Sequence, residues 1–315
     1  MSNHRVAVLK VVSKQLSVTA AAAAYGISRQ QLTRLVRRYR DGGLEALEPR
    51  SRRPLSNPGH TPDATRDRIV ALRRDLTARG LDAGPVTIAW HLEREGRPVP
   101  STSTIRRILH AAGLVVPEPR KRPRSSWIRF EATAPNECWQ SDFTHWRLAN
   151  GTDAEILTWL DDHSRYALSV TAHQPVTSRA VLDTFRRTGA DQGFPASVLT
   201  DNGMVFTTRL SGGKGGRNQL ETELRRLGAD QKNGRPWHPQ TQGKVERFQQ
   251  TLKNWLAAQP DQPATLAELQ TLLDRFRHEY NHQRPHKSLP HRAVPAVLYT
   301  SLPKATPSPR GRVQD

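Results

Sequence analysis

Hydrophobic residues near the start of the chain recur with the spacing of an α-helix. One stripe follows the i, i+3, i+4, i+7 pattern: Leu32, Leu35, Val36 and Tyr39. An Ala-rich segment at residues 18–25 precedes it and favours helix as well. Gly26 separates the two segments, and Ser28 stands where a helix N-cap is expected. The pattern predicts two short helices joined by a glycine turn.

The other face of the second predicted helix is polar and basic, with Arg29, Gln30, Arg34, Arg37, Arg38 and Arg40. Arg and Gln can bond both to phosphates and to base edges in the major groove. This pattern is typical of a helix-turn-helix that binds DNA. An ordinary helical hairpin with a solvated basic face is the alternative.

A second helical region follows at residues 63–116. Ile69, Leu72 and Leu76 form one stripe, and further helices are expected at residues 86–95 and 102–112. Ser101 is a candidate N-cap for the third helix. Three helices in about 50 residues again resemble a helix-turn-helix module. Because its basic face is weaker, a small helical spacer is the alternative.

The pattern changes in the second half of the chain. Strand-like runs are found at residues 137–148, 154–161, 166–173, 196–200 and 229–232. Helical segments alternate with the later strands and follow them, at residues 176–189, 218–227, 243–257 and 266–280. This order predicts an α/β domain with a mixed sheet and helices on its faces.

Charge and composition narrow the class of protein. The 315 residues include 48 Lys and Arg but only 29 Asp and Glu, a formal net charge of +19, which points to a polyanionic partner such as nucleic acid. Cys138 is the single cysteine, so an intramolecular disulfide and a multi-cysteine zinc site are excluded. The start of the chain lacks the apolar core of a signal peptide, and no run is long enough to cross a bilayer. We expect a soluble cytoplasmic protein without a membrane partner, associated with the nucleoid when bound to DNA.

Two Pro- and Arg-rich stretches resemble linkers that could lie along a phosphate backbone. The second contains Lys121 and Arg122, for which DNA contact and a merely solubilising role are about equally supported. The expected organisation is a helix-turn-helix domain at 1–48, a linker at 49–62, a second helix-turn-helix-like domain at 63–116, a linker at 117–126, an α/β core with its C-terminal helix at 127–299 and a disordered tail at 300–315.

Three acidic residues are candidates for chemistry. Asp142 lies within a strand-like run, Asp201 follows a strand, and Glu246 lies one turn into a predicted helix. Carboxylates brought together from two strands and a helix suit a hard divalent ion such as Mg²⁺. A lone carboxylate is usually solvated or paired, so the hypothesis depends on all three together.

Five motifs occur in order at residues 139–144, 160–165, 200–206, 238–248 and 280–289: WQSDFT, LDDHSR, TDNGMVF, HPQTQGKVERF and YNHQRPHKSL. Together they resemble the integrase core of bacterial insertion-sequence transposases, the DDE type of the retroviral-integrase superfamily. The resemblance covers most of residues 127–299. Two preceding helix-turn-helix segments are also typical of these transposases.

The resemblance implies a ribonuclease-H-like fold and metal-dependent DNA cleavage and strand transfer. It assigns the catalytic and metal-binding acids to Asp142, Asp201 and Glu246, and Glu246 is the only carboxylate between Asp230 and Asp261. Two Mg²⁺ ions, with Mn²⁺ able to substitute, are the expected cofactors. The expected partners are double-stranded DNA, as element ends and target, and further copies of the chain that hold two ends together. A non-catalytic DNA-binding regulator with a decayed core, and a nuclease that does not join strands, are the alternatives.

The chain departs from the family pattern in one place. The spacing from Asp201 to Glu246 is wider than in many family members, and the Gly-rich insert at residues 211–217 accounts for much of the excess. Asp161 and Asp162 are further acids near Asp142, but adjacent strand residues point to opposite faces. A salt bridge to Arg165 is the simpler interpretation of that pair.

Several residues near Glu246 are candidate DNA contacts. Lys244 flanks it, and Lys253 lies two helical turns further on the same face, where a contact to DNA phosphate and a solvated side chain are about equally supported. Trp237 and His238 could stack on or bond to an unpaired end base, although Trp237 would equally suit a core. His282 and His286 have i, i+4 spacing, but Pro285 interrupts the helix. For the two histidines we expect packing or DNA-backbone contact, not metal binding.

Overall fold

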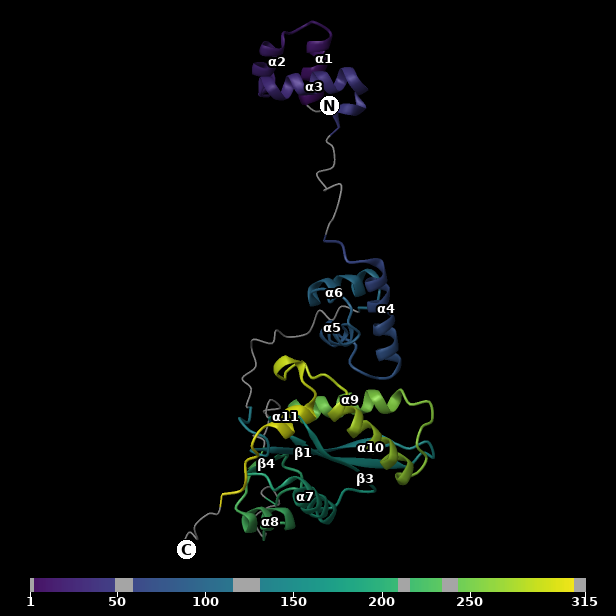
Figure 1. Ribbon diagram of the computed structural model, residues 1–315, viewed down its shortest axis with the longest axis vertical. Coiled ribbons are helices and arrows are strands. Elements are labelled where there is room, and N and C mark those ends of the chain that lie inside the picture. The colour runs from purple at the N-terminus through teal and green to yellow at the C-terminus, as the bar shows by residue number, and fades with distance from the viewer. Residues whose placement is uncertain (1–2, 49–58, 116–130, 209–215, 234–242, 309–315) are drawn as a thin grey trace. The chain divides into compact units, whose positions relative to one another are not determined.

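The computed structural model describes residues 3–48, 59–115, 131–208, 216–233 and 243–308 (Figure 1). The chain divides into two compact units, Met1–His60 and Thr61–Asp315. We describe each unit separately.

The first unit is a three-helix domain: α1 (Asn3–Val12), α2 (Val18–Tyr25) and α3 (Arg29–Gly42), followed by the short 3-10 helix η1 (Glu45–Leu47). Gly26 ends α2 with a φ of 62°, a left-handed conformation that glycine adopts at little cost. Ser28 Oγ then accepts a hydrogen bond from the backbone N of Gln31 at 3.2 Å, which confirms the predicted N-cap. The predicted two-helix module was incomplete, because α1 supplies Ala7 and Val8 to the same core.

The second unit begins with another three-helix module: α4 (Asp63–Ala78), α5 (Pro85–Arg94) and α6 (Thr102–Ala111). Its core contains the predicted stripe residues together with residues of α5 and α6: Ile69, Leu72, Leu76, Ile88, Leu92, Ile105 and Leu109. Ser101 Oγ accepts a hydrogen bond from the backbone N of Thr104 at 3.2 Å, as expected for the cap of α6.

A five-stranded mixed sheet forms the centre of the second unit, with strand order β3-β2-β1-β4-β5. The strands are β1 (Trp139–Arg147), β2 (Asp153–Asp161), β3 (Ala167–His173), β4 (Ser197–Thr200) and β5 (Asp230–Asn233). β1, β2 and β3 are antiparallel neighbours, whereas β4 runs parallel to both β1 and β5. This is the α/β mixed sheet that the sequence predicts.

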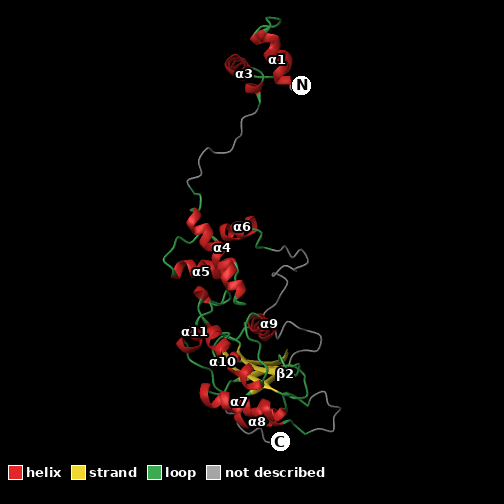
Figure 2. Cartoon of the chain, turned by 90° about the vertical axis from the view of Figure 1, so that its right-hand side faces the viewer, coloured by secondary structure: helices red, strands yellow, loops and turns green. Residues whose placement is uncertain are grey.

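Helices cover both faces of the sheet (Figures 1 and 2). On one face, α9 (Gly243–Ala257) and α10 (Leu266–His282) share a core with the sheet that contains Trp255 and Phe276. On the other face, α7 (Ser178–Gln192) and α8 (Gln219–Leu227) pack around a second core. The sheet is therefore covered by helices on both sides.

The C-terminal segment differs from its prediction. A 3-10 helix, η3 (Pro290–Arg292), and a short helix, α11 (Pro295–Ser301), follow α10. Tyr299 stacks on Tyr166 with a centroid distance of 4.4 Å. The backbone N of Ala305 donates to Pro135 O at 2.8 Å. The prediction of a disordered tail from residue 300 is therefore wrong for residues 300–308, while residues 309–315 lie outside the described residues.

The α4–α6 module contacts the sheet domain through the loop after α4. Arg79 Nη2 lies 2.9 Å from Glu279 Oε1, and Arg284 of the sheet domain pairs with Asp82. A Cβ placed on Gly80 would lie 2.4 Å from the backbone O of Asn254 in α9. This close approach requires glycine at residue 80.

Candidate active site

Asp142 lies on β1, the central strand, and is half-buried. Its Oδ1 accepts a hydrogen bond from the backbone N of Phe143 at 2.8 Å. Its Oδ2 accepts one from Gln249 Nε2 of α9 at 3.1 Å. The Asp142 carboxylate is thus held between its own strand and the helix that carries Glu246.

Asp201 reaches the same region because of the strand register. β4 runs parallel to β1 and pairs Thr200 with Ser141. The next residue on each chain is a candidate acid, Asp201 after β4 and Asp142 on β1. Its Oδ1 accepts a hydrogen bond from the backbone N of Gly203 at 2.9 Å. The turn after β4 therefore fixes the Asp201 carboxylate.

Glu246 is in the first turn of α9 and is exposed. The helix is anchored by its opposite face, where Val245 and Phe248 are buried in the core. Gln249, one turn further on, contacts Asp142 directly. The three acids predicted from the sequence are consequently carried by β1, by the end of β4 and by a helix packed against β1.

The pKa of Asp142 is influenced by both of the other acids, Asp201 and Glu246. Its pKa is raised from 3.8 to about 6, first because burial disfavours the ionised form and then because of the negative charge of Asp201. Glu246 adds a smaller effect in the same direction, while the hydrogen bonds from Phe143 and Gln249 oppose it. Perturbed carboxylates of this kind concentrate at functional sites.

The chemistry of these donors suits a hard cation. Asp142, Asp201 and Glu246 offer only oxygen donors, the ligands that Mg²⁺ prefers. A divalent cation would neutralise the charge that raises the pKa of Asp142. Within the described residues, no group of three or more His, Cys, Asp or Glu side chains is arranged to hold a metal ion.

The structure corrects the prediction for Asp161 and Asp162. Arg165 pairs with Glu131, Nη2 to Oε1 at 2.8 Å, and not with either aspartate. Asp161 is fully buried and accepts hydrogen bonds from the backbone N of Asn136 and from Ser164. Asp161 therefore organises the turn after β2.

Asp162 has a different set of partners. It is also fully buried, and its Oδ2 lies 2.6 Å from Lys244 Nζ. Burial lowers the pKa of Lys244, with Arg165 acting in the same direction and Asp162 opposing it. In this structure the Lys244 ammonium group is engaged in the ion pair with Asp162, and its contact with DNA stays a prediction.

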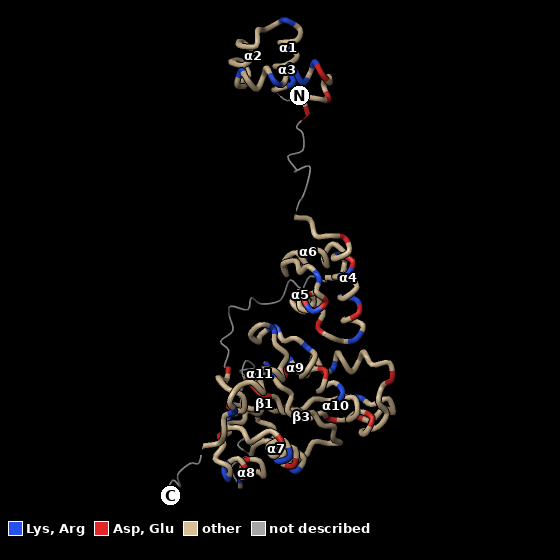
Figure 3. Tube along the Cα trace, viewed as in Figure 1, with Lys and Arg blue, Asp and Glu red and all other residues tan. Residues whose placement is uncertain are grey.

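The other residues predicted to contact DNA differ in their surroundings. On α3, the side chains of Arg29, Gln30, Arg34 and Arg37 are exposed. Arg38 is half-buried and donates from Nη2 to Glu48 O at 2.9 Å, so it supports the end of the domain. Figure 3 shows basic residues along α3. Lys253 is half-buried on α9, and its contact with phosphate stays a prediction.

Four predicted residues, Lys121, Arg122, Trp237 and His238, lie outside the described residues. Of the two histidines, His286 is half-buried and bonds through Nδ1 to Ser288 Oγ at 2.9 Å. Burial, together with Arg284, lowers the pKa of His286 to about 3, so it is neutral and packed. His282 is exposed, and α10 ends there.

Sequence reasoning missed two glutamines. Gln249 lies three residues after Glu246 and bonds to Asp142, and Gln140 lies two residues before Asp142 and bonds to Asp162. Their spacing from the acids was the available signal, since i+3 in a helix and i−2 in a strand place side chains on the same face.

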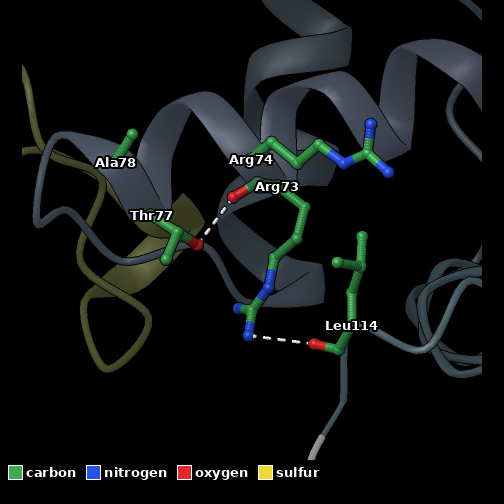
Figure 4. Close-up of a pocket in the computed structure, with 5 residues that line it drawn as sticks. All are labelled: Arg73, Arg74, Thr77, Ala78 and Leu114. Carbon is green, nitrogen blue, oxygen red and sulfur yellow. Dashed lines mark hydrogen bonds between the residues drawn. The ribbon is translucent and has the colours of Figure 1, made fainter.

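A separate surface cavity of about 380 Å³ is lined by Arg73, Arg74, Thr77, Ala78 and Leu114. Figure 4 shows the Arg73 side chain directed across it toward Leu114. Arg73 donates to Ala83 O at 2.8 Å and to Leu114 O at 3.2 Å, so its guanidinium links α4 to the loop after it and to the segment after α6.

None of the described helices has the length and apolar character needed to cross a membrane.

Comparison with known proteins assigns the same regions. Two models described as integrase core domain match residues 132–239 and 227–293, which together span just over half of the chain. A helix-turn-helix domain model matches residues 4–54, and a homeodomain-like domain model matches residues 31–109. The helix-turn-helix match covers α2, α3 and all of α1 except Asn3.

Individual relatives are insertion-element proteins. The chain is 29% identical over 240 residues to an uncharacterized 31.7 kDa protein of insertion element IS407 from Burkholderia multivorans, covering 74% of this chain and 80% of that protein. It is 26% identical over 300 residues to the transposase InsD of insertion element IS2 from Escherichia coli, covering 90% and 91%. Among solved structures, the HTLV-2 integrase catalytic core domain in complex with magnesium matches with a TM-score of 0.42 and 21% identity, over 54% of this chain and 99% of that one.

These comparisons agree with the motif order in the sequence: the helix-turn-helix match comes first, the integrase core matches follow it, and the relatives are insertion-element proteins. The chain belongs to the family of integrase-core transposases of insertion elements.

Proposed function

We propose that this chain is a transposase that binds the ends of a mobile DNA element and catalyses metal-dependent cleavage and joining of DNA strands. One observation carries the proposal: Asp201 and Glu246, 59 and 104 residues from Asp142 in the sequence, both raise the pKa of the Asp142 carboxyl. Carboxylates that repel one another in this way are costly to the fold and are expected where a cation neutralises them.

Asp142, Asp201 and Glu246 would hold the metal. A pair of bound Mg²⁺ ions would supply activation of water or a 3′-hydroxyl and stabilisation of the leaving oxygen in in-line phosphoryl transfer. The chain itself orients the acids: the Phe143 N–H and the Gln249 amide hold the two oxygens of Asp142. Glu246 is exposed on the first turn of α9, so its side chain is free of packing that would prevent it from turning toward the other two.

DNA recognition is assigned to α3 of the first unit. Its exposed Arg29, Gln30, Arg34 and Arg37 lie on the side opposite the buried stripe. Residues at the start of a recognition helix are those that reach base edges, and further basic residues contact phosphates. The net charge of +19 adds attraction to DNA that does not depend on sequence. Because two element ends must be brought together, we propose a homo-oligomer on DNA.

The catalytic part is tested with labelled duplexes that carry the element ends, in Mg²⁺ or Mn²⁺. Asp142→Asn, Asp201→Asn and Glu246→Gln should each abolish cleavage and joining while DNA binding persists. Asp153→Asn is the matched control, since this aspartate is exposed on β2 and pairs with Arg147. Cleavage that survives in Asp142→Asn would refute the assignment. Binding without any cleavage by the unaltered chain would indicate a non-catalytic regulator, and cut but unjoined products would indicate a nuclease.

The DNA-binding part is tested separately by titrating the same duplex at several salt concentrations. Arg34→Ala should weaken binding and, if this residue contacts phosphate, reduce the salt slope by about 1. The control is Arg147→Ala, which removes the same charge from the exposed end of β1. Equal losses in the two variants would show that charge alone, not α3, determines binding.

A further inference from the structure

The first turn of α9 is tied to the sheet by polar side chains that the proposed chemistry does not itself use. Asp162, fully buried just after β2, accepts hydrogen bonds from Lys244 Nζ at 2.6 Å and from Gln140 Nε2 at 2.6 Å. The backbone N of Ala132 donates to the same carboxylate at 2.8 Å. Asp162 thereby joins three separate parts of the chain.

Gln140 connects this carboxylate to the helix backbone. Its Oε1 accepts a hydrogen bond from the backbone N of Val245 at 3.2 Å, while its Nε2 donates to Asp162. Val245 is in the first turn of α9, where a backbone N–H has no partner within the helix. A side chain from β1 therefore satisfies this backbone donor of α9.

Lys244 completes the link from the other side. Its Nζ also lies 3.3 Å from the backbone O of Asp162, so the ammonium bonds to both the side chain and the main chain of that residue. The buried negative charge of Asp162 stands near the N-terminal end of α9, where the helix dipole favours an anion. The pair and the dipole act together to hold this helix end in one place.

We propose that Gln140, Asp162 and Lys244 form a positioning network that sets the place of Glu246 relative to Asp142, an inference that rests on the proposed function. Gln140 precedes Asp142 by two residues on β1, and Lys244 precedes Glu246 by two on α9. Glu246 is exposed, so its carboxylate is placed by the backbone of the helix turn and not by packing of its own side chain. The network links the two backbones through buried hydrogen bonds.

The consequence for metal binding follows from preorganisation. Partners that orient metal ligands without touching the metal typically change affinity or activity by 10–100-fold when removed. Loss of the network should leave Glu246 present but less constrained, because the first turn of α9 would fray. The concentration of Mg²⁺ needed for half-maximal cleavage should then rise about tenfold, with less effect on the rate at saturating metal.

The deciding measurement is amide hydrogen exchange of peptides covering residues 243–249, in the full chain without metal or DNA. Gln140→Met should speed exchange at Val245 by about tenfold or more while the amide of Phe248, inside the helix, stays protected. Lys244→Met should have a similar effect, and Lys244→Arg should restore part of the protection. Arg247→Met is the matched control, because this exposed neighbour contacts Gln250 and not Asp162.

The outcomes separate the network from the proposed function. Unchanged exchange in both Gln140→Met and Lys244→Met would overturn the network, whatever the activity. Fast exchange across the whole domain in Gln140→Met, Lys244→Met and also the conservative Lys244→Arg would show a general loss of folding. That result would also overturn a local role for the network. If the unaltered chain cleaves no DNA in Mg²⁺, the proposed function fails, while the exchange pattern still decides whether the network holds α9.

Discussion

Removing the charge of Asp142 should stabilise the protein in the absence of metal while abolishing catalysis. The pKa of this carboxyl is about 6 in the folded protein against 3.8 for the free side chain, mainly because of burial and then because of Asp201. One pKa unit corresponds to about 1.4 kcal/mol. Ionising Asp142 in the folded protein therefore costs about 3 kcal/mol, and Asp142→Asn removes that cost at neutral pH.

The sign of the pH dependence is specific. Because the folded pKa is raised, the folded state binds more protons than the unfolded chain between about pH 4 and 6, and stability falls as the pH rises through that window. Below about pH 4 the carboxyl is protonated in both states. The advantage of Asp142→Asn should thus be close to zero at pH 4 and grow to about 3 kcal/mol above pH 6.

Urea denaturation at several pH values between 4 and 8, in chelator, measures this difference. Addition of Mg²⁺ should stabilise the unaltered protein more than Asp142→Asn, since bound cation stabilises the folded state by mass action. A variant that is equally stable or less stable than the original at pH 8 would refute the electrostatic argument. The Asn side chain keeps an acceptor for the Phe143 N–H, and the Gln249 amide must turn so that its oxygen accepts from the new NH2 group.

Three further changes test other parts of the structure by denaturation of the full chain. Hydrogen bonding to Arg226, and then to a second arginine, lowers the pKa of Glu223 to about 2. Glu223→Gln should therefore lower the free energy of unfolding by about 2 kcal/mol at pH 7, and this loss should shrink as the pH falls from 4.5 toward 2. Gly80→Ala places a Cβ 2.4 Å from a backbone oxygen of α9 and should cost at least about 2 kcal/mol, whereas Gly96→Ala, with a similar positive φ and open space, should cost only about 1. Ser28→Ala removes the cap of α3 and should cost about 1 kcal/mol in the transition of the first unit.

Elements with strong local signals were predictable from the sequence. The helix at 243–257 has the predicted bounds, and the Ser28 and Ser101 caps are where the polar pattern places them. Caps and amphipathic stripes depend on residues within a few positions of one another, so a short window contains the necessary information. The three candidate acids were also identified in advance, but from their motifs and not from local pattern alone.

Elements defined by distant contacts were missed. α1 has a mixed Ala and Val pattern without a clear polar face, and its helical state is fixed by packing of Ala7 and Val8 against α2 and α3. The partners of Asp162 are 22, 30 and 82 residues away in the sequence, and Arg165, the nearby candidate, pairs with Glu131 instead. Sequence proximity suggested the wrong ion pair because a buried carboxylate is satisfied by whatever donors the fold brings to it.

The place of the site follows from the unequal lengths of two parallel strands. β4 is four residues long and stops opposite Ser141, whereas β1 continues to Arg147. From Asp142 onward β1 therefore has no pairing with β4, and the chain that leaves β4 at Asp201 turns away beside it. Asp201, the residue after β4, lies outside the carboxyl end of its strand, which is where open α/β sheets bind ligands. The same register that ends the pairing with β4 leaves Asp142 beside the turn that begins at Asp201, and α9, which carries Glu246, contacts Asp142 through Gln249.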